Sequence, residues 1–242
     1  MIETKRLETI RAGKFEIPIL YLDNHLLGVV MPCNMPVQAD DSRDLDLLTA
    51  LKGYIGEKFM KPGAVYLGLV HRLDRPVGGV MIFARTSKAA ERLSRDFAGH
   101  DLEKRYLAVL QGEMTGPRTL LEDYLVKDGK TGMVRVCPPD EPGAKQARLV
   151  TSPIAARQGT TLTEVALMTG RAHQIRVQHM HAGFPLWGDA RYGGGRPGEQ
   201  IALWAYRLTV THPTLKTPLT LCAAPPDEGA WRLYRAEMET LP

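Results

Sequence analysis

Residues 67–86 read L-G-L-V-H-R-L-D-R-P-V-G-G-V-M-I-F-A-R-T, and they place a charged loop between two short apolar runs. The runs at 67–70 and 80–84 are rich in branched side chains, as strands are. Pro76 and the Gly-Gly pair that follows it interrupt the apolar pattern, as loop residues do. The stretch therefore predicts a strand, a loop and a second strand.

Asp74 lies at the centre of this loop, between Arg72 and Arg75 and three residues after His71. A carboxylate on a loop at the end of a strand is a candidate for chemistry. Neighbouring guanidinium groups favour its ionised form, which suits a nucleophile or a base. A structural ion pair in a surface loop is the alternative that these residues alone leave open.

The composition is that of an ordinary globular protein with a mild excess of positive charge. The 242 residues are enough for one large domain or two small ones, with 44% hydrophobic and 24% charged residues. A formal charge of +4 makes nucleic acid a plausible partner, although many other enzymes carry a similar charge.

Cysteine usage predicts a reducing compartment, and hydropathy predicts a protein without a signal peptide or a membrane helix. Cys33, Cys137 and Cys222 lie far apart, with no C-x-x-C pair and no even count for a disulfide framework. The first residues lack an apolar core of signal-peptide length, and no run of about 18 apolar residues occurs. We therefore expect a soluble, cytoplasmic protein.

Periodicity elsewhere predicts a chain of mixed strands and helices without repeats or linkers, hence one continuous domain over residues 1–242. Residues 1–17 read as an irregular lead-in or a short edge strand. Ser87 is expected to cap the helix that follows the central loop. Strands are predicted at 19–30 as a hairpin, 103–112, 119–163 as hairpins, 163–168, 201–210 and 219–223, and helices at 43–59, from 87, at 171–182 and at 229–241.

Three places in this pattern carry candidate chemistry: the Asp74 loop, the strand with Tyr106, and the predicted helix that begins G-R-A-H-Q-I-R. On that helix, Arg171 and Arg176 would lie about 140° apart, so only one is expected to reach Asp74. Arg171 would lie at the helix N-terminus, which favours anions such as phosphate. Arg176, a turn deeper, would be better placed to hold a carboxylate.

The motif H-R-L-D-R at 71–75, followed by Gly79, resembles the signature of the RluA family of pseudouridine synthases. K-R-Y-L-A at 104–108 and G-R-A-H-Q-I-R-V at 170–177 resemble two further motifs of that family, in the same order. The likeness continues through Gly188-Asp189 and Tyr192-Gly193 and covers most of the chain. It implies an α/β protein of the α+β type, with a mixed, largely antiparallel sheet and flanking helices.

The resemblance also implies a reaction: isomerisation of uridine in ribosomal or transfer RNA, without cofactor or metal. Asp74 takes the place of the family's essential aspartate, Tyr106 of the aromatic residue that stacks on the target base, and Arg176 of the arginine paired with the aspartate. His71 and Arg72 are expected to hold the loop or to contact the flipped strand. The side chains expected to bind substrate are His71, Arg72, Arg75, Arg171, His173 and Gln174.

Several positions depart from the family pattern, and they bear on the choice of RNA more than on the reaction. Met31 stands where lysine is common, and Asn34 where glycine is common, although asparagine tolerates a left-handed backbone. The other departures are Gly78, Ala172, Gln178 and Trp204. We expect no separate N-terminal RNA-binding domain, no membrane contact, no obligate protein partner and a monomer.

Two other functions remain open at this point. The chain could be a non-catalytic RNA-binding or assembly protein that retains the fold, or a carboxylate-dependent hydrolase that releases free uracil from a nucleoside. A metal site is not expected, because His179 and His181 are two residues apart and would not share a helix face.

Overall fold

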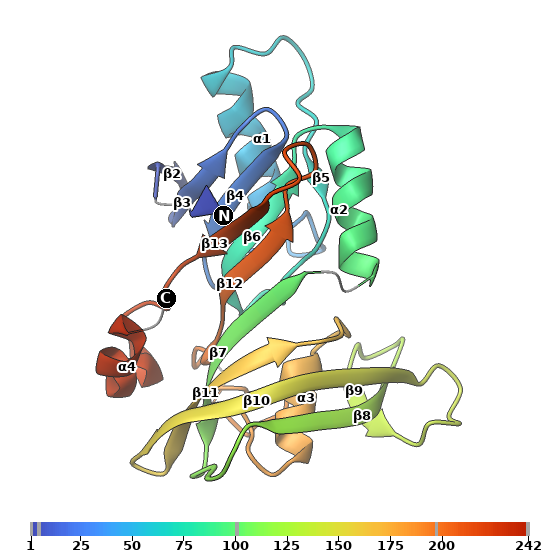
Figure 1. The fold of residues 1–242 in the computed structure, drawn as a ribbon, viewed down its shortest axis with the longest axis vertical. Coiled ribbons are helices and arrows are strands. Elements are labelled where there is room, and N and C mark those ends of the chain that lie inside the picture. The colour runs from blue at the N-terminus through green and yellow to red at the C-terminus, as the bar shows by residue number, and fades with distance from the viewer. Residues whose placement is uncertain (1, 4–5, 100–101, 197, 241–242) are drawn as a thin grey trace. The chain divides into compact units, whose positions relative to one another are not determined.

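The computed structural model describes residues 2–3, 6–99, 102–196 and 198–240. The chain is of the mixed α+β type, as predicted (Figure 1). It forms two compact units, each built from discontinuous segments: a first unit of Met1–Glu103 with Ala205–Ala223, and a second unit of Lys104–Trp204 with Ala224–Pro242. The prediction of one continuous domain stays a prediction.

The first unit is built on a sheet whose pairings include the hairpin predicted about Asp23. Its strands lie in the order β2 (Glu8–Ala12), β3 (Phe15–Leu22), β4 (Leu26–Met31), β6 (Gly78–Ala84) and β12 (Leu203–Thr211). Three short strands join this sheet: β13 (Pro218–Cys222) beside β12, β5 (Gly68–Leu69) beside β6, and β1 (Ile2–Glu3) beside β13. The strands β5 and β6 flank the Asp74 loop, as the apolar runs predict.

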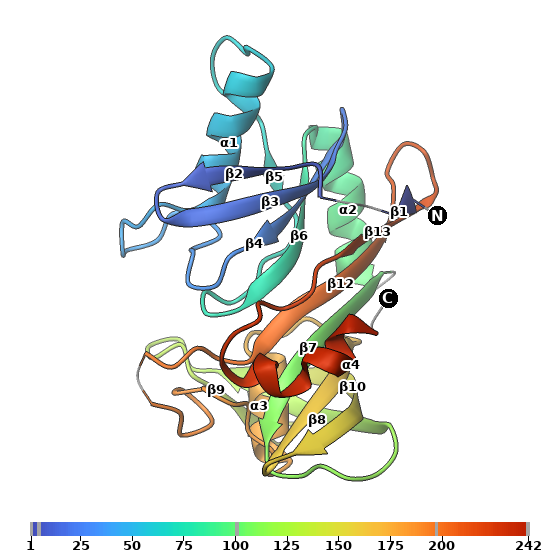
Figure 2. The same cartoon turned by 90° about the vertical axis from the view of Figure 1, so that its left-hand side faces the viewer.

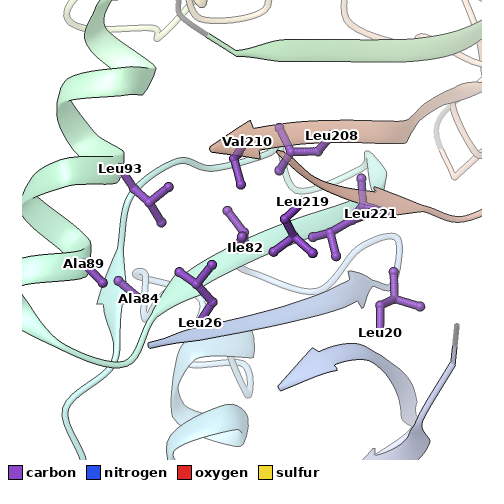
Figure 3. Packing of buried hydrophobic residues seen from close by; sticks show 11 residues of the cluster. Leu20, Leu26, Ile82, Ala84, Ala89, Leu93, Leu208, Val210, Leu219 and Leu221 are labelled. Carbon is purple, nitrogen blue, oxygen red and sulfur yellow. The ribbon is translucent and has the colours of Figure 1, made fainter. Parts of the chain in front are cut away.

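Two helices belong to the first unit, α1 (Leu47–Lys58) and α2 (Ser87–Gly99). Helix α2 directs Ala89 and Leu93 toward the side chains of β4, β6, β12 and β13 (Figure 3). Ile82 lies in the centre of this cluster and is fully buried. Burial of apolar surface contributes about 25 cal/mol per Å², so this cluster stabilises the packing of α2 on the sheet.

The second unit carries an antiparallel sheet in the order β7, β11, β10, β8, β9, with the turns near Gly132, Gly143 and Gly159 that the sequence indicates. The strands are β7 (Glu103–Gln111), β8 (Thr119–Lys127), β9 (Val134–Cys137), β10 (Lys145–Arg157) and β11 (Thr160–Leu167). Helix α3 (Gln174–His181) packs on β8 and β9 (Figure 2). Val177 of α3 is fully buried in that contact.

Helix α3 begins three residues later than predicted. His173 has a left-handed backbone (φ 51°), and the Gln174 side chain accepts the N–H of Arg171, so the residues before Gln174 form a turn. Arg171 therefore lies outside the helix, and the predicted anion site at its first turn is wrong. The angle of 140° between Arg171 and Arg176 does not apply, because the two residues do not share one helix.

Residues 8–12 form the paired edge strand β2, which confirms the second of the two alternatives given for the start of the chain. Two smaller differences concern a cap and the C-terminal segment. The hydroxyl of Thr86, not of Ser87, accepts the N–H of Ala89 at the start of α2. The C-terminal segment is a 3₁₀ helix, η1 (Gly229–Tyr234), followed by α4 (Arg235–Glu239), while Leu241 lies outside the described residues.

Helix α3 presents a buried polar side chain to the sheet at His179. Its Nδ1 donates to the Ile175 carbonyl at 2.8 Å, and its Nε2 lies 3.1 Å from the Thr151 hydroxyl. In a neutral ring with the proton on Nδ1, Nε2 accepts, so the Thr151 hydroxyl is the donor of this second bond. Burial lowers the pKa of His179 from its ordinary 6.5 to about 4. The imidazole is therefore neutral in the folded protein at pH 7.

His179 should make the protein less stable in mild acid. In the unfolded chain His179 is protonated below about pH 6.5, whereas in the folded chain it is protonated only below about pH 4. The free energy of unfolding therefore falls as the pH drops from 6.5 to 4. The slope is at most about 1.4 kcal/mol per pH unit. Urea unfolding of wild type and His179→Asn from pH 7 to pH 4.5 measures it, and the variant should show the shallower slope. Equal slopes would contradict a neutral His179.

Candidate active site

The Asp74 loop is a tight turn anchored on both sides by buried side chains. Leu73 and Val77 are 5% and 2% exposed, and the carbonyl of Asp74 accepts the N–H of Val77 at 2.8 Å. Asp74 itself is half-buried. A carboxylate held on a rigid turn at the end of a strand can act as a nucleophile or as a base.

His71 joins this loop to both neighbouring layers. Its Nε2 accepts the N–H of Ile82 in β6 at 3.0 Å, which requires the proton of the neutral ring to be on Nδ1. The ring also stacks on Phe97 of α2, with centroids 4.5 Å apart and planes 13° apart. These contacts support the first of the two roles expected for His71, holding the loop.

The arginines next to Asp74 differ in their surroundings. Arg72 is exposed. Arg75 forms ion pairs with Asp44 and, at 3.6 Å, with Asp40, and its carbonyl accepts the N–H of Asn34 at 2.8 Å. Arg75 thus fastens the segment that contains Asp40 and Asp44 to the loop, and its expected role in substrate binding stays a prediction.

Two backbone positions near the loop need special residues. Asn34 has φ 65°, so it adopts the left-handed conformation expected of a residue that replaces glycine. Gly79 has φ 126°, and a β-carbon there would lie 2.2 Å from the backbone oxygen of Ala205 in β12. Only glycine fits at position 79, because the contact is with backbone that cannot rotate away.

In the second unit, Tyr106 lies where strand β7 leaves the core. It pairs with Val165 of β11 and is half-buried, whereas the next four residues along β7, 107–110, are fully buried. A half-buried phenol at such a position has one face packed against protein and can present another to a ligand. This geometry is compatible with the stacking role that the resemblance implies.

Arg176 is held in a buried bidentate ion pair with Asp189. Its Nε and Nη2 donate to the two carboxylate oxygens at 2.8 and 2.7 Å, and the two side chains are 7% and 1% exposed. The backbone N–H groups of Arg191 and Tyr192 donate to the same carboxylate. The Tyr192 ring centroid lies 5.1 Å from the guanidinium carbon. Arg176 is therefore fixed in position, while its predicted pairing with Asp74 stays a prediction.

Tyr192 also organises the turn before α3. Its hydroxyl bonds His173 Nδ1 at 2.7 Å and accepts the N–H of Val134 at 3.0 Å. Burial raises the pKa of Tyr192 above its ordinary value, so the phenol stays protonated. His173 thus has a protein partner on Nδ1, and its predicted contact with substrate would use the rest of the ring.

The side-chain amide of Gln174 is engaged within the protein, and the substrate-binding role that the sequence gives to this residue stays a prediction. It is 3% exposed, and its amide oxygen accepts from the Thr169 hydroxyl and the Arg171 N–H. Its amide nitrogen donates to the Arg148 carbonyl and to Gln178. All the hydrogen bonds that one amide can form are therefore used within the protein. Arg171 is half-buried, and its Nε donates to the Gln146 carbonyl.

Asp189 and Tyr192 are the residues that sequence reasoning did not single out. Both belong to the G-D-x-x-Y-G stretch that extends the third motif, which was the available signal. Spacing alone could not reveal their role, because Asp189 lies beyond the end of α3, on the loop that returns to Arg176.

Among the residues that the structure describes, no group of three or more His, Cys, Asp or Glu side chains is arranged to hold a metal ion. Within the same residues, no helix combines the length and the apolar character needed to cross a bilayer.

A family model described as RNA pseudouridylate synthase matches residues 27–182. The ribosomal large subunit pseudouridine synthase C of Vibrio vulnificus is 29% identical over 213 residues, which are 85% of this chain and 64% of that protein. The tRNA pseudouridine synthase C of Pasteurella multocida is 28% identical over 230 residues, covering 86% of this chain and 90% of that protein. The chain thus spans just under two thirds of the length of the Vibrio relative.

Two solved structures share the fold. Human RNA Pseudouridylate Synthase Domain Containing 4 superposes with a TM-score of 0.72 at 20% identity, over 91% of this chain and 92% of that one. Human RNA Pseudouridylate Synthase Domain Containing 1 has a TM-score of 0.67 at 21% identity, over 93% and 95% of the two chains. At this identity the likeness concerns the fold alone.

Substituting Gly79 tests the backbone contact beside the loop. Gly79→Ala adds both positive-φ strain, about 1–3 kcal/mol, and a clash with Ala205. Gly116→Ala is the matched control, because Gly116 has φ 121° but no atom within 4 Å of its added β-carbon. Urea unfolding should show the larger loss for Gly79→Ala. Equal losses would mean that the Ala205 contact adds nothing.

The buried ion pair should be costly to break. Asp189→Asn removes the buried carboxylate that accepts two hydrogen bonds from the Arg176 guanidinium, so we expect a loss of about 3–5 kcal/mol in the free energy of unfolding. Glu16→Gln breaks the exposed Arg11–Glu16 pair and should cost less than about 1 kcal/mol. Denaturant titration of both variants measures the two losses in the free energy of unfolding. A loss below about 1 kcal/mol for Asp189→Asn would contradict the conclusion that the buried pair stabilises the fold.

Proposed function

The chain belongs to the RNA pseudouridylate synthase family, which confirms the RluA-type resemblance of its motifs, and on that premise we propose that it isomerises specific uridines in RNA to pseudouridine. The observation that carries the proposal is Asp74, half-buried on a rigid turn inside the matched segment 27–182. A carboxylate that is held in place is what nucleophilic attack on a nucleotide requires.

In the proposed reaction the Asp74 carboxylate attacks either the uracil ring or the anomeric carbon of the ribose. The bond from the anomeric carbon to N1 breaks, the base turns, and a new bond forms from the anomeric carbon to C5. The bond between Asp74 and the carbon that it attacked also breaks before the product leaves, which restores the free carboxylate. The C5 proton is removed and N1 carries a proton in the product, so the composition of the nucleotide does not change. No oxidant, reductant or group donor enters this balance.

Tyr106 and Arg176 have complementary roles in the proposal. A uridine in a folded RNA must be turned out of its stack, at a cost of a few kcal/mol, and stacking on an aromatic ring offsets part of that cost. We assign this stacking to Tyr106, and we propose that the same residue helps to remove the C5 proton. Arg176 is assigned to orient Asp74. The two hydrogen bonds from the Arg176 guanidinium to Asp189 support this assignment, because they fix the position of the guanidinium.

The substrate class in this proposal is ribosomal or transfer RNA, because the relatives that resemble the chain are named for one or the other. Arg72, Arg75, Arg171 and His173 are assigned to contacts with the RNA. Neither Arg72 nor Arg171 is buried, which leaves their charge accessible to phosphate. The proposal also includes a cytoplasmic location and a monomer without an obligate protein partner.

Replacing the nucleophile tests the proposal. Asp74→Asn keeps the size of the side chain but removes its charge, so we expect pseudouridine formation to fall by at least about a thousandfold. Asp41→Asn, an exposed aspartate in the same unit, is the charge-matched control and should retain activity. Pseudouridine mapping on total RNA from cells lacking the gene, complemented with each variant, measures the effect and identifies the modified uridine.

The same comparison separates the alternatives. Equal pseudouridine formation by wild type and Asp74→Asn would favour a non-catalytic RNA-binding role. Release of free uracil by wild type alone, without pseudouridine in the RNA, would favour a nucleoside hydrolase. Circular dichroism and urea unfolding of both variants guard against a loss of activity through misfolding.

A further inference from the structure

The first unit contains a pocket outside the Asp74 loop. It has a volume of about 240 Å³ and lies between α2 and the turn from β12 to β13, two segments that Figure 1 shows side by side. Helix α2 contributes three lining residues and the turn region three more. The lining residues are Arg92, Arg95, Asp96, Thr211, Pro213 and Lys216. None of them has a part in the proposed reaction.

The pocket is strongly cationic. Two guanidinium groups and one ammonium group line it, against the single carboxylate of Asp96. On α2, Lys88, Arg92 and Arg95 follow each other at helical spacings of four and three residues, so they share one face and extend the positive charge beyond the pocket. A recessed site with this charge attracts anions more strongly than a flat surface does.

The turn side of the pocket is held in a defined shape. Arg92 donates from Nη1 to the Pro213 carbonyl at 2.6 Å, which fixes its guanidinium and leaves other N–H groups for a ligand. His212, which is fully buried, accepts the N–H groups of Thr214 and Leu215 on Nδ1 and bonds Asp23 through Nε2 at 2.8 Å. The turn therefore does not have to be ordered when a ligand binds, which lowers the cost of binding.

The other two cations are available at small cost. Arg95 pairs with Glu91 at 3.1 Å, but both side chains are more than 70% exposed, so the pair contributes at most about 1 kcal/mol and can be exchanged for a phosphate. Lys216 is exposed at the end of the turn. A phosphate in the pocket would thus gain charge-assisted hydrogen bonds without breaking a buried contact.

Helix α2 also links the pocket to the Asp74 loop. Phe97, the residue after Asp96, stacks on His71 at the start of that loop. A strand of RNA that places one nucleotide at Asp74 carries phosphates at regular intervals on both sides, and α2 contacts the loop through Phe97. The pocket is therefore well placed to hold a phosphate of the flanking chain.

We infer that the Arg92–Arg95–Lys216 pocket binds a backbone phosphodiester of the RNA substrate, away from the uridine that reacts. This inference rests on the proposed function for the identity of the anion. The contact would position RNA without reading its sequence, as phosphate contacts do.

The test measures binding of a fluorescent oligouridylate by anisotropy over a series of salt concentrations. Arg95→Gln combined with Lys216→Gln should raise Kd on the order of tenfold at low salt and reduce the slope of log K against log salt by about 0.7, the value for one phosphate on a single strand. Asp96→Asn, which removes the carboxylate from the pocket, should instead lower Kd.

Arg11→Gln combined with Lys14→Gln is the matched control, because it removes the same charge from exposed positions on the β2–β3 hairpin. Equal slopes for the two double variants, or no tightening by Asp96→Asn, would overturn the inference. Binding of inorganic phosphate by the wild type but not by Arg95→Gln/Lys216→Gln, with equal oligouridylate binding by the two proteins, would assign the pocket to a free anion instead. The anisotropy assay measures RNA binding and does not depend on the reaction. A protein that binds RNA through this pocket but forms no pseudouridine would contradict the proposed function without contradicting the phosphate site.

Discussion

The backbone oxygen of Ala205 occupies the space that a β-carbon of residue 79 would need, and much of the first unit depends on this close approach. It brings β12, from late in the chain, against the end of the loop that carries Asp74. The buried side chains of Leu73 and Val77 fix the same loop from within. A catalytic carboxylate needs this kind of support, because small displacements of a reacting group are costly in rate.

Charge is used in two different ways around the candidate site. The Arg176–Asp189 pair is buried, bidentate and supported by two backbone N–H groups, so it acts as a rigid part of the second unit. The Arg75–Asp44 pair is exposed and ties one loop to another at small net energy. The sequence assigns Arg75 to substrate contact and Arg176 to pairing with Asp74; the described partners include Asp44 for Arg75 and Asp189 for Arg176.

Local patterns predicted the elements of the fold more reliably than their ends. The strand, loop and strand about Asp74, the hairpin about Asp23 and the antiparallel strands after residue 119 are all present. The start of α3 was predicted three residues early, because the left-handed backbone of His173 and the side-chain bonds of Gln174 leave no mark in hydropathy. The burial of the Gln174 amide is hidden for the same reason, because motif letters do not show whether a side chain is exposed.

The family, the motif that carries Asp74 and the order of strands and helices follow from the amino-acid sequence alone, because they depend on residue identity and on periodicity along the chain. The partners of the charged groups emerge only in the folded chain: Asp189 for Arg176, Asp44 for Arg75, and the turn of β12 and β13 for Arg92. Coulombic attraction and hydrogen bonding act through space over a few ångströms, and residues that are far apart in sequence meet at that distance only after the chain has folded.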